Sequence, residues 1–147
     1  MKDEKIRKSI NVFLKMYFDS CKEVYKEINF ERITGTQFKY LKTIHKHGKV
    51  TLTMLSEIFN ASKPTINELI NKLYDSKIVI KTKSKVDKRV VYISLTEIGE
   101  LLATTNMLES KKLVENLKKK LTMDEIDSMA KIFDKLGVDE LWFLEKQ

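Results

Sequence analysis

The densest group of cationic side chains in this sequence lies in the segment 77–89. Six of these residues are Lys or Arg, and Asp87 is the only acidic residue among them. Clustered ammonium and guanidinium groups attract polyanions, and Arg suits the negative potential of a narrow minor groove. Asp87, two residues before Arg89, is placed to hold the guanidinium by charge-assisted hydrogen bonds. The segment therefore indicates a DNA contact made by Lys85, Asp87, Lys88 and Arg89, with a solvated charged turn as the alternative.

A second set of polar side chains lies in the segment 62–75. Its apolar residues recur at helical spacing, which predicts a helix with a buried face formed by Ile66, Leu69, Ile70 and Leu73. Ser62 is suited to cap this helix, and Pro64 falls in its first turn. In a major groove, Asn can pair with adenine, Glu with cytosine, Thr with a thymine methyl group, and Lys with phosphates. The candidate DNA-binding residues here are Ser62, Lys63, Pro64, Thr65, Asn67, Glu68, Asn71 and Lys72. A solvated helix face is the alternative.

Two preceding helices are expected to position this segment. Thr34 and Gln37 form a capping-box pattern, which predicts a helix that ends at Gly48. Val50 is expected to form a very short strand. A third helix follows, capped by Thr51 or Thr53, with inward-facing Leu55, Ile58 and Phe59. Asn60-Ala61 then makes a tight turn into the helix of segment 62–75.

The basic segment itself is expected to be the tip of a β-hairpin. Apolar and polar residues alternate on both sides of it, with Ile78 and Ile80 before the tip and Val91, Ile93 and Leu95 after it. Helix, turn, helix and hairpin together predict a winged helix-turn-helix region over 33–98.

Long helices are expected on both sides of this region. A helical apolar stripe runs from Ile6 to Ile28, and a long helix is predicted from Thr96 to about Lys120. A second capping box, Thr122 with Glu125, opens a last helix that should end at Gly137, with inward-facing Ile126, Met129, Ile132, Phe133 and Leu136. The fold class is thus mainly α with a small β-hairpin wing, with dimerisation helices in 1–32 and 99–147. Exposed apolar surface marks an interface, so the expected dimerisation residues are Ile6, Ile10, Phe13, Leu141, Trp142 and Phe143.

The composition narrows the class of protein. A net charge of +7 in 147 residues favours a polyanionic partner, with plain solubility as the alternative. A single cysteine excludes an intrachain disulfide and suits a reducing compartment, and no apolar run approaches a membrane span. We therefore expect a cytoplasmic protein with no membrane contact. Phosphate-binding loops, nucleophile elbows and paired-histidine motifs are missing, so we expect neither an enzyme nor a cofactor.

The sequence offers few candidates for a sensor. Cys21 lies on the apolar stripe, which favours an inert buried thiol over a redox sensor, although Tyr17 and Tyr25 lie one turn away. His45 and His47 point to opposite sides of a helix, so no metal site is expected. A small-molecule effector is compatible with Tyr17, Phe18, Phe38, Tyr40 and Met107, which otherwise read as core residues.

Several of these motifs together resemble the MarR family of transcription regulators. Asp87-Lys88-Arg89 followed by Leu95-Thr96-Glu97-Ile98-Gly99 matches the family's D-x-R and L-T-x-x-G. Segments 33–38 and 55–57 resemble the family's L-T-x-x-Q-F and L-A-E. The resemblance implies a homodimer with intertwined terminal helices, bound to a roughly palindromic double-stranded DNA site. It implies Arg89 in the minor groove, oriented by Asp87, and helix 62–75 in the major groove. It also implies control of transcription, usually repression, often relieved by a small molecule, metal or oxidant.

One position departs from the family pattern, and two other functions remain open. A Gly normally follows the recognition helix, where this chain has Lys77, so we expect a reshaped or mildly strained turn. The first alternative function is a sequence-neutral, architectural DNA-binding protein. The second is a winged-helix module that binds only proteins.

Overall fold

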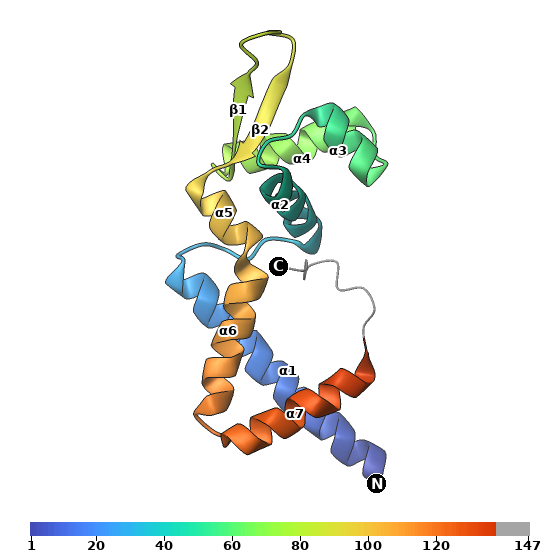
Figure 1. The fold of residues 1–147 in the computed structure, drawn as a ribbon, viewed down its shortest axis with the longest axis vertical. Coiled ribbons are helices and arrows are strands. Elements are labelled where there is room, and N and C mark those ends of the chain that lie inside the picture. The colour runs from blue at the N-terminus through green and yellow to red at the C-terminus, as the bar shows by residue number, and fades with distance from the viewer. Residues whose placement is uncertain (138–147) are drawn as a thin grey trace. The chain divides into compact units, whose positions relative to one another are not determined.

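The computed structural model describes residues 1–137, which divide into two compact units (Figure 1). The first contains α1 (Lys2–Glu27), α6 (Thr105–Lys118) and α7 (Met123–Leu136). The second, Ile33–Thr104, contains α2 (Gly35–His47), α3 (Leu52–Phe59), α4 (Lys63–Asp75), β1 (Val79–Lys83), β2 (Val91–Leu95) and α5 (Glu97–Ala103). The mainly helical fold with a two-stranded wing is confirmed. Within residues 1–137, no helix combines the length and apolar character that crossing a membrane requires.

Side-chain caps set the helix boundaries of the second unit. Thr34 and Gln37 form the predicted capping box at the start of α2, and Gly48 ends that helix. The Thr51 hydroxyl accepts a hydrogen bond from the Met54 N–H and begins α3, which settles the choice between Thr51 and Thr53. Each cap satisfies backbone N–H groups that have no partner inside the helix.

The wing, residues 79–95, is an antiparallel hairpin with Val79 opposite Leu95 and Lys83 opposite Val91. Ile93 also pairs with Val50, at 2.7 and 2.9 Å, which confirms the short strand expected there. The alternation predicted for β1 is wrong. Val79 is buried, whereas Ile80 is 46% exposed. The apolar pattern predicted that Ile78 and Ile80 share one side of the strand. Ile78 is buried, but it precedes β1, and within the strand the buried position is Val79 and not Ile80.

The exit from α4 accommodates Lys77 in a left-handed conformation, with φ of 60°. The Ile78 N–H donates to the Leu73 carbonyl and the Lys77 N–H to the Tyr74 carbonyl, both at 2.9 Å. These two bonds form the Schellman motif that usually has Gly at this position. The turn therefore keeps the geometry of a glycine-terminated helix, and Lys77 carries the strain of a positive φ.

The core of the second unit lies where its helices meet the base of the wing. Its fully buried side chains are Leu41, Ile44, Val50, Leu55, Ile66, Ile70, Leu73, Val79, Ile93 and Leu102. The predicted inward position of Ile58 is wrong, since it is 47% exposed, and Leu69 is only half-buried. Phe59 stacks on the buried Tyr40, with ring centroids 4.1 Å apart.

In the first unit, α1 packs against α6, and α7 contributes no buried residue. The long helix expected from Thr96 to Lys120 is interrupted at Thr104, so α5 belongs to the winged unit and α6 to this one. The prediction that the apolar residues at the end of α7 are buried is wrong for the single chain. Ile132, Phe133 and Leu136 are 61%, 45% and 69% exposed. Leu141, Trp142 and Phe143 lie outside the described residues.

Candidate nucleic-acid interface

The turn at the tip of the wing is folded by its own hydrogen bonds. The Ser84 hydroxyl oxygen accepts from the Val86 and Asp87 N–H groups, at 3.2 and 3.3 Å. The Ser84 N–H donates to the Val90 carbonyl at 2.8 Å, and the Val90 N–H to the Asp87 carbonyl at 2.9 Å. The tip therefore has a defined backbone. Lys85, Lys88 and Arg89 in this turn are exposed to solvent.

Asp87 holds the Arg89 guanidinium by one edge. Arg89 Nε donates to Asp87 Oδ1 and Nη2 to Oδ2, both at 3.1 Å, and the Arg89 backbone N–H donates to Oδ1 at 3.0 Å. These bonds lower the pKa of Asp87 below its ordinary value, so the carboxylate stays ionised. The Arg89 side chain is nevertheless 91% exposed. Its other N–H groups are available to a ligand.

Helix α4 begins with the predicted Ser62 cap. The Ser62 hydroxyl accepts from the Thr65 N–H at 3.4 Å and lies 2.8 Å from the Thr65 hydroxyl. Glu68 and Lys72 form an exposed ion pair at 3.5 Å, one turn apart. Lys63, Pro64 and Asn67 are also exposed. The candidate residues of α4 thus form one polar, accessible face, except that Asn71 is half-buried.

Asn71 has a partner on the wing that the sequence analysis did not identify. Lys81 Nζ, on β1, lies 2.5 Å from Asn71 Oδ1 and 4.9 Å from the centroid of the Tyr74 ring. Lys81 had been counted only as one charge of the basic segment. Nothing in the local pattern relates residue 81 to residue 71, because the contact depends on how β1 packs against α4.

Ser56 is another residue whose role was missed. Its hydroxyl donates to the Ala61 carbonyl at 2.5 Å, and the Ala61 N–H donates back to the Ser56 carbonyl at 3.2 Å. Asn60, between them, is left-handed with φ of 47°. This pair fixes the turn that connects α3 to α4. A serine near the end of a helix, where it competes with backbone hydrogen bonds, was the available signal.

Cys21 lies in a buried polar cluster between α1 and α6. Its side chain is 2% exposed, and that of Glu109 on α6 is 7% exposed. The Tyr17 hydroxyl donates to Glu109 Oε2 at 3.4 Å. Burial raises the pKa of the Cys21 thiol, and the Glu109 carboxylate raises it further. Burial also raises the pKa of Glu109 and of Tyr17. Both effects on Cys21 oppose the thiolate that a redox sensor needs.

We expect Cys21 to be slow to alkylate in the native protein. A raised pKa leaves less thiolate at pH 8 than an ordinary cysteine has, and burial restricts access, so iodoacetamide should react at least roughly tenfold more slowly than with the urea-unfolded chain. The rate should rise in Glu109→Gln, which removes the carboxylate that disfavours the thiolate. A native rate equal to the unfolded rate would instead identify an activated thiol.

His45 contacts an acidic residue of a neighbouring helix. His45 Nδ1 contacts Glu100 Oε2 and links α2 to α5. Across residues 1–137, no three His, Cys, Asp or Glu side chains are grouped so as to hold a metal ion.

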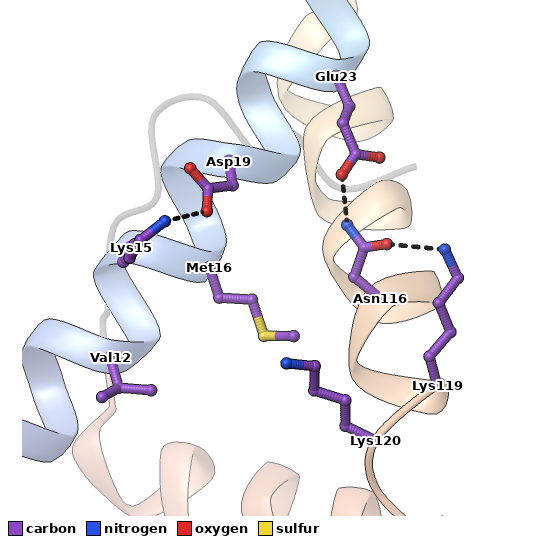
Figure 2. A pocket seen from close by; sticks show the side chains of 8 residues that line it. All are labelled: Val12, Lys15, Met16, Asp19, Glu23, Asn116, Lys119 and Lys120. Atoms are coloured by element: carbon purple, nitrogen blue, oxygen red, sulfur yellow. Dashed lines mark hydrogen bonds and ion pairs between the residues drawn. The ribbon is translucent and has the colours of Figure 1, made fainter.

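A pocket of about 430 Å³ opens between α1 and α6 (Figure 2). Its lining residues are Val12, Lys15, Met16, Asp19, Glu23, Asn116, Lys119 and Lys120. Lys15 pairs with Asp19 at 2.6 Å, and Asn116 is held by Glu23 and Lys119. None of the residues proposed from sequence as pocket lining belongs to it. The lining combines the apolar side chains of Val12 and Met16 with three lysines and two carboxylates.

Comparison with known proteins agrees with this arrangement. A model of the MarR family matches residues 33–91. The uncharacterised HTH-type transcriptional regulator YhbI of Bacillus subtilis (strain 168) is 27% identical over 123 residues, which cover 78% of this chain and 80% of YhbI. The crystal structure of YusO from Bacillus subtilis has a TM-score of 0.65 at 20% identity and covers 90% of this chain and 92% of its own. A mutant of MarR from E. coli, crystallised with operator DNA, has a TM-score of 0.51 at 22% identity, covering 90% and 93%. Both structures share the fold of this chain.

Proposed function

We propose that this chain is a sequence-specific, double-stranded-DNA-binding transcription regulator of the MarR family, whose model matches residues 33–91, and that it acts as a dimeric repressor. In this proposal α4 enters a major groove, and the wing places Arg89 in the adjacent minor groove. The net charge of +7 supports a polyanionic partner. Repression follows if the operator overlaps a promoter, because a bound dimer then excludes the polymerase.

The Asp87–Arg89 pair is the observation that carries this proposal. Exposed ion pairs add little to the free energy of unfolding. A contribution to stability therefore does not account well for the two side-chain hydrogen bonds between Asp87 and Arg89 at the tip of the hairpin. The pairing instead orders a long side chain in advance of binding while leaving it 91% exposed. A guanidinium presented in this way suits the potential of a minor groove.

Selection of duplexes from a random pool by the purified chain tests the proposal, followed by affinity measurements across a salt series. We expect a palindromic consensus bound at least roughly 10³-fold more tightly than random DNA. Tight binding without sequence preference would support the architectural alternative. A lack of binding even at low salt would support the protein-contact module.

We propose that the apolar side of α7 is a dimer interface, buried against a second copy of this chain. Phe13 on α1 contacts Phe133, with ring centroids 5.6 Å apart, but much of this surface faces solvent. The exposed apolar side chains of the unit include Ile6, Ile10, Met123, Ile132, Phe133 and Leu136. Surface of this kind marks an interface, and two-fold symmetry matches a palindromic site.

We expect Phe133→Asp to convert the dimer to monomers at micromolar concentration, because it places a carboxylate in the proposed apolar interface. Ser128→Asp is the matched control, since it adds the same group at an exposed, uncharged position of α7 away from the apolar side. Sedimentation velocity distinguishes the two species. A Phe133→Asp protein that still sediments as a dimer would exclude this surface as the interface.

The pocket of Figure 2 supports relief of repression by a small organic acid. Val12 and Met16 suit an apolar body, and Lys120, whose ammonium lies beside Met16, suits a carboxylate. In a panel of aliphatic and aromatic acids, we expect at least one compound to weaken operator binding. Its effect should diminish in Lys120→Ala. An equal effect in that variant would place the effector elsewhere.

A further inference from the structure

Asn71, Tyr74 and Lys81 form a cluster where the exposed face of α4 meets the wing. Lys81 Nζ lies 2.5 Å from Asn71 Oδ1, and 4.9 Å from the centre of the Tyr74 ring. Lys81 and Tyr74 are exposed and Asn71 is half-buried, so a ligand has access to all three. The cluster joins a residue of the proposed DNA-reading helix to a residue of the neighbouring strand.

The chemistry of Lys81 determines which way the Asn71 amide is turned. An ammonium group only donates hydrogen bonds, so the Asn71 atom that faces it is the carbonyl oxygen Oδ1. The Nδ2 group, with its two hydrogens, is turned away from Lys81. Pairing of Asn with adenine needs Oδ1 to accept from the adenine N6 amino group while Nδ2 donates to N7. In this protein Oδ1 is already engaged.

Tyr74 keeps Lys81 beside Asn71. A cation above an aromatic face is attracted by the ring's negative charge density. The ammonium therefore has two partners on α4, which oppose its movement towards a phosphate. Lys81 occupies one of the two lone pairs of Asn71 Oδ1, and its positive charge disfavours the approach of a base amino group to the other, so the pair presents mainly hydrogen-bond donors.

We propose that Lys81 is a specificity-determining residue that biases Asn71 towards donating hydrogen bonds, so that this part of α4 favours guanine over adenine. Guanine presents two major-groove acceptors, O6 and N7, whereas adenine presents one acceptor and one donor. The proposal rests on the proposed function, with α4 in the major groove. It replaces the adenine pairing suggested from sequence for Asn71 and leaves that pairing open for Asn67.

The test compares the base preferences of Lys81→Met and wild type. Methionine keeps an unbranched chain but cannot donate, so Asn71 Oδ1 becomes available to adenine. Lys83→Met is the matched control, because it removes the same charge from an exposed position on the same strand. Affinities are measured for the selected operator with each base pair substituted in turn, and Asn71→Ala identifies the positions that residue 71 reads.

At the positions identified by Asn71→Ala, wild type should favour guanine over adenine roughly tenfold. Lys81→Met should abolish or reverse that preference, whereas Lys83→Met should lower affinity evenly over all sites. An unchanged preference in Lys81→Met would overturn the proposal, as would a change confined to positions that Asn71→Ala leaves unaffected. Absence of any consensus for wild type would instead refute the proposed function. Since residues 81 and 83 are exposed, equal melting temperatures are expected for all three proteins.

Discussion

Arg89→Ala is expected to lower operator affinity at least roughly tenfold without altering the fold. The side chain is 91% exposed, and its hydrogen bonds within residues 1–137 go only to Asp87, so no core contact is lost. A dimer would lose the contact at both wings, which enlarges the effect. Fluorescence anisotropy with the selected operator measures the loss, and far-UV circular dichroism with thermal melting tests the fold.

Two variants separate the role of the guanidinium from that of its charge. Lys83→Ala removes a wing charge without touching the Asp87–Arg89 pair, and should weaken specific and random DNA by the same small factor. Arg89→Lys keeps the charge but loses the planar guanidinium that bonds both carboxylate oxygens of Asp87. Its operator affinity should therefore be close to that of Arg89→Ala. Retained affinity with an unchanged salt dependence in Arg89→Ala would show that the wing tip does not contact DNA.

Gly99→Ala is expected to destabilise the winged unit by roughly 3 kcal/mol. A Cβ atom at this position would lie 2.2 Å from the Ile78 carbonyl oxygen and 3.2 Å from Leu95 Cβ. That carbonyl already accepts a hydrogen bond from the Thr96 N–H at 3.0 Å, and the Thr96 hydroxyl lies 3.0 Å from it. The obstruction is backbone at the base of the wing, so it cannot be relieved by rotating a side chain.

Gly35→Ala is the matched control, since it is also in the first turn of a helix but has no atom within 4 Å of its added Cβ. Alanine is the better helix former, so Gly35→Ala should be neutral or slightly stabilising. Urea unfolding followed by circular dichroism compares the two variants. A Gly99→Ala protein as stable as wild type would mean that the start of α5 shifts away from Ile78 without penalty. The wing geometry described here would then be incorrect.

Local chemistry made much of the fold predictable. The capping boxes at Thr34 and Thr122, the Ser62 cap and the turn at Asn60 all involve residues within a few positions of each other. The same holds for the Asp87–Arg89 pair, whose two-residue separation allows few geometries. Such features depend on backbone hydrogen bonds that form whatever lies elsewhere in the chain.

The errors arose where burial depends on distant elements. Hydrophobic periodicity identifies which residues share a face but not whether anything covers that face. Ile58 and the apolar end of α7 therefore followed the helical pattern yet are exposed in one chain. In β1, the buried position is Val79 and the exposed one is Ile80, which is the reverse of the predicted alternation.

Residue types and their spacing along the chain were enough to predict the winged helix-turn-helix order, most helix ends and the basic tip with its paired arginine. The contact of Lys81 with Asn71, the position of Gly99 against the Ile78 carbonyl and the buried cluster of Cys21 with Glu109 instead became evident from the folded chain. The physical reason is the range of the interactions. Caps and turns are decided by neighbours along the chain, whereas these contacts join residues that only the packing of separate elements brings together.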